Sequence, residues 1–163
     1  MKIVFMGTPE YAVPSLEALL NQGHEIIIVV TQPDKPRGRG KKVSFSPVKQ
    51  AAVEHGIPVY QPNRIKDDES VAFLKGLQCD LMVTAAFGQI ISDEVLSIPM
   101  HGCINVHASL LPRYRGAAPI QWAIINGEKQ TGVTTMMTDS GIDTGDMLLS
   151  KAVDIMPEET ADE

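Results

Sequence analysis

The chain has 163 residues, 44% of them hydrophobic and 21% charged, which is ordinary for one soluble globular domain and too short for two. Its formal net charge of −6 excludes wholesale binding of nucleic acid, so any contact with RNA has to be local. Its two cysteines form no CxxC pair, which excludes a disulfide scaffold or a zinc ribbon and favours a reducing compartment.

The apolar stretches that membranes and secretion require are missing. Spanning a bilayer takes about 18 consecutive apolar residues, and no segment approaches that length. The N-terminal apolar run, Ile3 to Met6, is also shorter than the hydrophobic region of a signal peptide. We therefore expect a cytoplasmic protein.

Short apolar runs alternate with helical patterns along the chain, which is typical of a mostly parallel sheet covered by helices. The nearly continuous Ile and Val of Glu25–Val30 indicate a central strand that is buried on both faces. The runs predicted to be strands are Lys2–Met6, Glu25–Val30, Ile57–Tyr60, Asp80–Ala85, Gly102–His107, Thr131–Thr138 and Met147–Val153.

The segments between these strands carry helix signals. Leucines share one helical face just ahead of Gly23, where a helix would stop. Ser46 and Pro47 favour a helix start, because serine caps and proline tolerates the first helical position. Further helices are expected over 67–77 and 119–127. The predicted fold class is α/β: a Rossmann-like, open, mostly parallel sheet with helices on both faces.

The last eight residues carry one more helix signal. Pro157 is followed by four acidic residues, and acidic groups complement the positive end of a helix dipole. We predict that a helix begins at Pro157. On composition, the alternative is a disordered acidic tail.

Two candidate catalytic residues lie on the predicted strand 102–107. Asn105 and His107 are two positions apart, so their side chains share a face, about 6–7 Å apart, a spacing that suits one small carbonyl group. They lie at the carboxyl end of the strand, where ligands bind in open α/β sheets. Cys103 shares that face but is about 13 Å from His107, too far for a Cys–His pair, and is interpreted as a packing residue. Spacing alone leaves open whether His107 is catalytic or structural.

A loop rich in carboxylates and glycine follows over Asp139–Asp146. It is either a tight connection between strands, since Asp and Gly favour turns, or a catalytic loop whose carboxylate orients a histidine. A calcium loop fits poorly, because the alternating oxygen ligands and the closing glutamate are missing.

Longer motifs resemble those of a known family, the folate-dependent formyltransferases. Asn105–Pro112 and Arg113–Gly116 resemble its Asn-x-His and Ser-Leu-Leu-Pro-x-x-x-Gly motifs, and Gly132–Leu148 is similar to its second signature. The resemblance covers essentially the whole chain and is strongest to the branch that formylates charged tRNA. The further segments that match this branch are Gly7–Glu10, Thr31–Lys42, Gly102–Ile104 and Gly116–Gln121.

The resemblance implies an enzyme that transfers a formyl group from 10-formyltetrahydrofolate to the α-amine of methionine on initiator tRNA, in translation initiation. It implies that Asn105, His107 and Asp143 are catalytic. Asn105 and a protonated His107 can stabilise the oxyanion that forms when the amine attacks, while Asp143 holds His107 charged. No metal is expected, because the N-formyl donor is already activated.

The resemblance also implies a site for the folate cosubstrate, with its pterin near 87–90 and the 139–143 loop. The Leu111–Pro112 peptide bond is expected to be cis, as in the resembling enzymes. The predicted cofactor-binding residues are Phe87, Gly88, Gln89, Ile90, Ser109, Leu110, Leu111, Pro112, Asp139 and Gly141.

The segment Lys35–Lys42 holds five of the fourteen lysines and arginines. By composition it is either a solvated flexible loop or a contact for the phosphate backbone of RNA, where cations displace counterions. The resemblance favours the second interpretation. It implies that Arg37, Arg39, Lys41 and Lys42 bind tRNA.

The resembling enzymes continue into a β-rich C-terminal domain that helps to hold tRNA. We therefore predict that 1–163 is one catalytic domain, incomplete at its C-terminal end and without that second domain, and we expect a monomer.

Rival functions differ in how well they fit. A nucleotide-dependent enzyme is disfavoured, because Gly7–Glu10 lacks the GxGxxG fingerprint and no GxxxxGK[ST] loop occurs. Purine-pathway and sugar-nucleotide formyltransferases share the catalytic residues, so only the cationic segment 36–42 favours tRNA. A non-catalytic folate-binding protein and a formyl-folate hydrolase stay open as alternatives.

Overall fold

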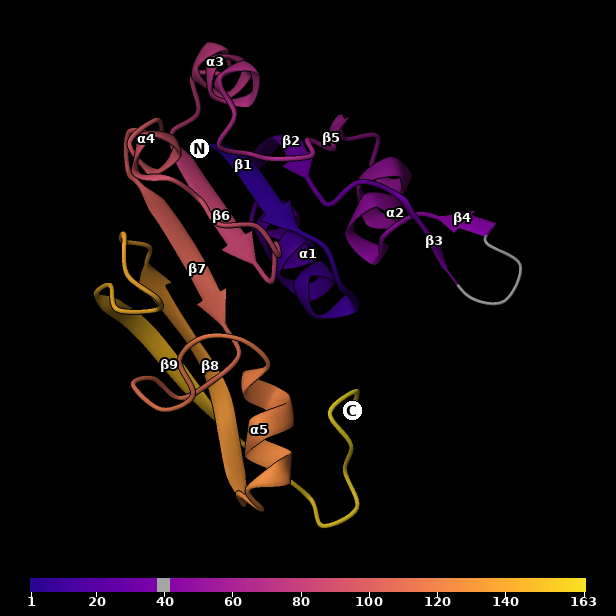
Figure 1. Ribbon diagram of the computed structural model, residues 1–163, viewed down its shortest axis with the longest axis vertical. Helices are drawn as coiled ribbons and strands as arrows, with labels where there is room; N and C mark the ends of the chain where they lie inside the picture. The colour runs from indigo at the N-terminus through magenta and orange to yellow at the C-terminus, as the bar shows by residue number, and fades with distance from the viewer. Residues whose placement is uncertain (38–41) are drawn as a thin grey trace. The chain divides into compact units, whose positions relative to one another are not determined.

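The computed structural model describes residues 1–37 and 42–163, with the side chains of 36, 37, 42 and 43 left aside (Figure 1). The chain forms two compact units, Met1–Cys103 and Ile104–Glu163. Among the described residues, no helix combines the length and the apolar character that crossing a bilayer demands.

The first unit is built on four parallel strands in the order β5-β2-β1-β6. Strands β1 and β6 are buried along their whole length apart from Lys2, as expected for parallel strands covered on both faces. These strands confirm the predicted ones to within two residues at each end. Their bounds are β1 Lys2–Gly7, β2 Glu25–Val30, β5 Val59–Tyr60 and β6 Leu81–Ala85.

Helices cover both faces of this parallel sheet. Val4 and Met6 of β1 pack in one core cluster with residues of α3 and α4. Because side chains alternate along a strand, Ile3 and Phe5 point to the opposite face, where α1 and α2 lie against each other. The predicted α/β class is therefore confirmed. The helix bounds are α1 Val13–Asn21, α2 Pro47–Glu54, α3 Asp68–Gly76 and α4 Asp93–Leu96.

The predicted helix boundaries at Gly23 and Ser46 are also confirmed. The Ser46 hydroxyl accepts a hydrogen bond from the Lys49 N–H at 3.1 Å, and Pro47 is the first residue of α2. Gly23, just beyond α1, has a φ of 77°, a conformation that glycine adopts without a steric cost.

Some short elements were not predicted. The cationic segment forms an antiparallel hairpin of β3 (Lys35–Arg37) and β4 (Lys42–Ser44), in which Arg37 pairs with Lys42. Neither strand has the apolar alternation from which strands are predicted. A single 3-10 turn, η1 (Glu10–Ala12), and the one-turn helix α4 are likewise too short to show a period.

The second unit is antiparallel. β7 (Cys103–His107) begins at the boundary, and β8 (Gln130–Met137) pairs with it and with β9 (Met147–Asp154). Helix α5 (Pro119–Ile125) connects β7 to β8 and buries Ala123. The predicted strands of this unit are confirmed to within one residue at each end. Cys103 is buried in the core cluster of the first unit, which confirms it as a packing residue.

The predicted helix at Pro157 is wrong, because residues 157–163 form turns. The Glu159 carboxylate accepts a hydrogen bond from the Met156 N–H at 2.7 Å, and Glu163 accepts one from the Thr160 N–H at 2.8 Å. Both contacts have the spacing of a helix-capping box. Capping alone does not offset the cost of ordering the first helical turn, so the signal appears without the helix.

Candidate active site

The structure brings the three predicted catalytic residues together within the second unit. Asn105 and His107 lie on β7, and Asp143 lies on the loop between β8 and β9. Asn105 Nδ2 donates to Asp143 Oδ1 at 3.2 Å, and His107 Nδ1 lies 3.5 Å from Asp143 Oδ2. The expectation that Asn105 and His107 share one face of the strand is confirmed, since both side chains reach the same carboxylate.

Asp143 is held firmly from several sides. The Gly116 N–H donates to its Oδ2 at 2.8 Å, and Arg115 Nε donates to its main-chain carbonyl at 3.0 Å. Its φ of 50° lies in the left-handed region, which residues other than glycine seldom adopt, although aspartate does so more often than most. The His107 and Asp143 side chains are only 8% and 15% exposed, so their interaction is partly shielded from water.

His107 has a second partner that the sequence did not indicate. Its Nε2 lies 2.8 Å from the main-chain carbonyl oxygen of Tyr114, another residue with a positive φ. The Tyr114 hydroxyl in turn donates to Glu128 Oε1 at 2.6 Å. Tyr114 lies inside the matching motif as a variable position, whereas Glu128 carries no motif signal.

The Ser-Leu-Leu-Pro segment is fixed against β8 by polar contacts. Ser109, which is fully buried, donates through its hydroxyl to the Arg113 carbonyl at 2.7 Å, and its own carbonyl accepts from Thr134 Oγ1 at 2.7 Å. Thr134 Oγ1 also accepts from the Leu111 N–H at 3.2 Å. The predicted cis peptide bond at Leu111–Pro112 is confirmed.

Four cofactor-binding residues were predicted in this segment, and the side chains of two of them, Ser109 and Leu110, pack inside the unit and hold the segment in place. Ser109 is buried, and Leu110 packs so closely over Gly132 that a Cβ there would lie 2.6 Å from Leu110 Cδ2. Leu111 is half-buried and Pro112 is exposed. Leu110 is half-buried as well, so Ser109 is the residue of this group that is closed to a ligand.

The 139–146 loop is a tight connection between β8 and β9, which is one of the two interpretations that the sequence left open, and it also carries Asp143. Asp139 Oδ1 accepts from the Gly141 N–H at 3.0 Å and from Thr144 Oγ1 at 2.8 Å, so this carboxylate shapes the turn. A Cβ on Gly141 would lie 1.9 Å from Thr144 Oγ1, and one on Gly145 would lie 1.8 Å from the Met137 carbonyl oxygen. Asp139 and the glycines build the loop, and Asp143 faces the histidine.

The predicted folate residues 87–90 lie in the first unit. The Phe87 side chain is 3% exposed and packs in the core, and Gly88 has a φ of 85°. The Gln89 side chain accepts from the Ile65 N–H at 2.7 Å and donates to the Pro62 carbonyl at 3.0 Å. Ile90, at 81% exposure, is the side chain of this group that is open to a ligand.

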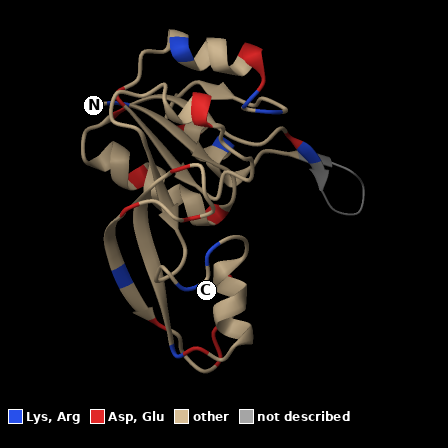
Figure 2. Ribbon diagram, turned by 60° about the vertical axis from the view of Figure 1, so that its left-hand side comes forward, with Lys and Arg blue, Asp and Glu red and all other residues tan. Residues whose placement is uncertain are grey.

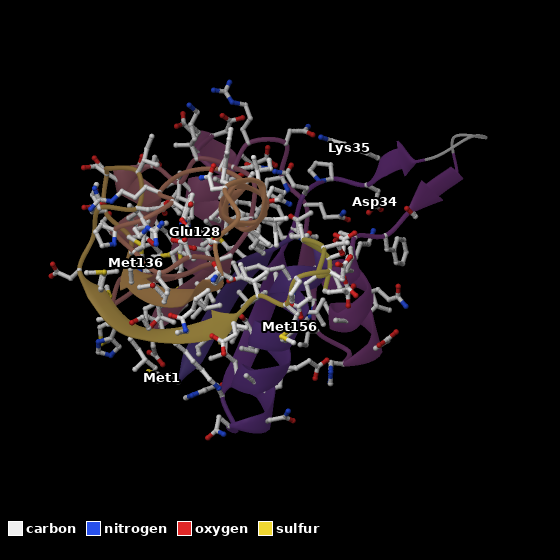
Figure 3. All side chains as sticks on the ribbon, turned by 90° about the horizontal axis from the view of Figure 1, so that it is seen from below. Met1, Asp34, Lys35, Glu128, Met136 and Met156 are labelled. Carbon is white, nitrogen blue, oxygen red and sulfur yellow. The ribbon has the colours of Figure 1, made fainter. Side chains whose placement is uncertain are left out.

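The base of the cationic hairpin is anchored by Asp34. Its carboxylate forms an ion pair with Lys49 and accepts from Gln61 Nε2 at 2.9 Å, and these hydrogen bonds lower the pKa of Asp34. Figure 2 shows positive charge on the hairpin beside negative charge at its base, and Figure 3 labels the two neighbours Asp34 and Lys35.

Two of the four predicted tRNA-binding residues, Arg39 and Lys41, lie outside the described residues. Arg37 and Lys42 pair across the hairpin. Within the part of the chain that the structure describes, no three His, Cys, Asp or Glu side chains are grouped so that they could hold a metal ion.

Comparisons with known proteins identify the family of this chain. The sequence profile described as "Formyl transferase" matches residues 1–163. A methionyl-tRNA formyltransferase of Ruminiclostridium cellulolyticum is 63% identical over 163 residues, which are 100% of this chain and 52% of the relative. One of Acetivibrio thermocellus is 60% identical over the same shares. The chain thus spans about half the length of these curated relatives.

The fold has a solved counterpart. The crystal structure of phosphoribosylglycinamide formyltransferase from Bacillus halodurans matches 99% of this chain and 84% of its own, with a TM-score of 0.78 and 25% identity. Both the sequence profile and this likeness extend over the strand and the loop that carry Asn105, His107 and Asp143. This chain belongs to the formyl transferase family.

Proposed function

We propose that this chain carries the catalytic site that transfers a formyl group from 10-formyltetrahydrofolate to the α-amine of methionine esterified to initiator tRNA. One observation carries the proposal: Asn105 and His107 meet on the Asp143 carboxylate within a single unit. The identity of about 60% to methionyl-tRNA formyltransferases supports the choice of acceptor. The activity serves translation initiation, in the cytoplasm and with the protein as a monomer.

The chemistry requires a bond between the amine nitrogen and the formyl carbon to form, and the bond between that carbon and folate N10 to break. Negative charge develops on the formyl oxygen in between. Asn105 Nδ2 has two N–H groups and gives one to Asp143, so the other can donate to this oxyanion. A protonated His107 places a positive charge beside the same oxygen, which stabilises the oxyanion further.

Asp143 has two roles in this proposal. Its negative charge stabilises the protonated form of His107, and its carboxylate takes the proton that the attacking amine loses, directly or through a water. That proton finally reaches N10 of the leaving tetrahydrofolate, so atoms and charge balance. The fixed orientation of Asp143, held by Gly116 and Asn105, suits both roles because little has to move during the reaction.

We assign the remaining predicted residues by their accessibility. Pro112, which is exposed beyond the end of β7 in the unit that carries Asn105, His107 and Asp143, is proposed to contact the folate. Asp139 and Gly141 shape the loop that presents Asp143, and the hairpin cations Arg37 and Lys42 contact the phosphates of tRNA.

The test is the release of tetrahydrofolate from 10-formyltetrahydrofolate, measured with and without methionyl-tRNA. Release that depends on charged tRNA, together with formyl-methionine on the tRNA, supports the proposal. Equal release in both arms indicates a formyl-folate hydrolase, and binding without release indicates a non-catalytic folate-binding protein.

A further inference from the structure

The two ring nitrogens of His107 have different surroundings. Nε2 lies 2.8 Å from the Tyr114 carbonyl oxygen, which can only accept a hydrogen bond, so Nε2 carries a proton. Nδ1 faces Asp143 Oδ2 at 3.5 Å, on the side of the ring where Asn105 contacts the same carboxylate. Because one nitrogen is committed to the carbonyl, proton exchange is left to Nδ1.

The position of the Tyr114 carbonyl depends on the Tyr114 side chain. Tyr114 has a φ of 56°, which a tyrosine does not adopt without support from its surroundings. That support comes from the phenol, whose hydroxyl donates to Glu128 Oε1 at 2.6 Å and accepts from Asn126 Nδ2 at 2.9 Å. Tyr114 is thus held at two points: its main-chain carbonyl contacts His107, and its hydroxyl donates to the Glu128 carboxylate.

Several contacts hold Glu128 in place, so its carboxylate can fix the position of the Tyr114 hydroxyl. Its carboxylate also forms an ion pair with the Arg113 guanidinium, the neighbour of Tyr114. Its main-chain N–H donates to the Ala123 carbonyl at 3.0 Å, which ties it to the end of α5. The hydrogen bond from Tyr114 lowers the pKa of Glu128, so the carboxylate stays ionised and accepting at neutral pH. Figure 3 labels Glu128.

We propose that Tyr114 and Glu128 are positioning residues that hold His107 in its Nε2–H form and so make Nδ1 the nitrogen that takes part in formyl transfer. This inference rests on the proposed function for its catalytic meaning. The tautomer itself is a property of the unit Ile104–Glu163 and is measurable without any turnover.

The first experiment is ring ¹⁵N–¹H spectroscopy of the whole 163-residue chain with labelled histidine, at pH about 8.5, where an ordinary imidazole is neutral. The variant His107→Gln identifies the His107 signal among the four histidines. We expect Nε2 of His107 to carry a proton in the unsubstituted chain, whether or not Nδ1 beside Asp143 carries one as well. Tyr114→Phe and Glu128→Ala should give mixed tautomers with faster proton exchange, and Glu128→Gln, which keeps an acceptor oxygen, should restore the original spectrum.

A matched control removes a phenol hydroxyl elsewhere. Tyr60 makes a hydrogen bond of 2.9 Å with Ser70 in the first unit, so Tyr60→Phe loses a comparable contact without touching His107. We expect its His107 spectrum to be unchanged. An Nδ1–H tautomer in the unsubstituted chain, or an unchanged tautomer in both Tyr114→Phe and Glu128→Ala, would overturn the proposal.

The second experiment measures formyl transfer by the same variants. Tyr114→Phe should lower kcat roughly 10- to 100-fold, by analogy with the loss of a partner that orients a metal-ligating histidine, with KM for the folate nearly unchanged. Glu128→Gln should recover most of the rate. A loss confined to KM, or no loss of rate, contradicts the inference. Absence of turnover in the unsubstituted chain would count against the proposed function instead, and the spectra would still decide the tautomer.

Discussion

Asp143 is the residue on which the site depends most, because Asn105, His107 and Gly116 all contact its carboxylate. Asp143→Asn keeps the size of the side chain and removes the negative charge beside His107. We expect formyl transfer to lose about 3–4 kcal/mol of transition-state stabilisation, similar to the loss of one oxyanion-stabilising group. His107→Ala should cost a similar amount. The measurement is the single-turnover rate with charged tRNA.

The control for Asp143→Asn lies in the same loop. Asp146 is exposed and contacts Met137 through its main-chain carbonyl, so Asp146→Asn removes a charge without removing that contact. Its transfer rate should stay within about twofold of the original, a difference below 0.5 kcal/mol. Turnover at the original rate by Asp143→Asn would show that the carboxylate has no catalytic role.

At the level of residues, the motifs predicted that Asn105, His107 and Asp143 come together, but they did not predict the contacts of His107 with Tyr114 and of Tyr114 with Glu128. Asn105 and His107 could be paired from strand spacing, since a strand fixes which side chains share a face. The contact of His107 with Tyr114 uses a main-chain carbonyl, which any residue offers, and Glu128 reaches Tyr114 across fourteen positions. Neither contact leaves a residue pattern in the sequence, so both required the structure.

At the level of elements, the start of α2 is the most strongly specified helix end. The Ser46 hydroxyl accepts from the Lys49 N–H and also makes a buried hydrogen bond of 2.9 Å with Thr31 Oγ1. Ser46→Ala should lower the free energy of unfolding by about 1–2 kcal/mol, the upper part of the range for a lost N-cap. Urea denaturation measures this loss.

The matched control is the substitution of Ser92, which caps the one-turn helix α4. Ser92 accepts from the Val95 N–H at 3.5 Å, at the start of the one-turn helix α4, so Ser92→Ala loses a weaker contact. It should destabilise the chain less than Ser46→Ala does. Equal losses would mean that the buried contact with Thr31 contributes nothing to stability.

Substitutions in the cationic hairpin test how the protein binds tRNA, not how it transfers the formyl group. Replacing Arg37 and Lys42 together by glutamine should weaken the binding of charged tRNA and reduce its salt dependence, because each lost phosphate contact releases fewer counterions. Affinity for a folate analogue should change little. The measurement is the dissociation constant for both ligands at several salt concentrations.

A control variant that loses the same number of positive charges elsewhere separates the effect of the hairpin itself from the effect of net charge. Lys66 and Lys129 are exposed and lie outside the hairpin, so their double replacement by glutamine changes the net charge by the same amount. It should leave tRNA binding nearly unchanged. If the hairpin variant weakens folate and tRNA equally, the hairpin belongs to the folate site.

Among the elements, the long strands and helices could be predicted because their burial imposes a period on the sequence. β2 was predicted at its observed bounds, since a strand that lies inside a parallel sheet is apolar at nearly every position. The hairpin and the C-terminal turns have exposed residues and short spans. Pro157 and its acidic neighbours show that a cap signal without an apolar helical face does not predict a helix.

At the level of the whole molecule, the proposed catalytic residues Asn105, His107 and Asp143 all belong to the unit Ile104–Glu163, and the hairpin belongs to Met1–Cys103. The relatives are about twice as long as this chain. We propose that their remaining half adds contacts to tRNA, and linked contacts multiply affinity. The chain on its own should therefore bind folate but formylate charged tRNA slowly.

A chimera tests the central claim most directly. This chain replaces the 63% identical region of the Ruminiclostridium cellulolyticum relative, and formyl-methionyl-tRNA is measured for the chimera and for its Asp143→Asn version. We predict that the chimera formylates at a rate close to that of the relative, and that Asp143→Asn lowers the rate at least about 100-fold while the protein stays folded. A folded chimera that binds folate but makes no formyl-methionyl-tRNA, or an Asp143→Asn chimera as active as its parent, would contradict the account.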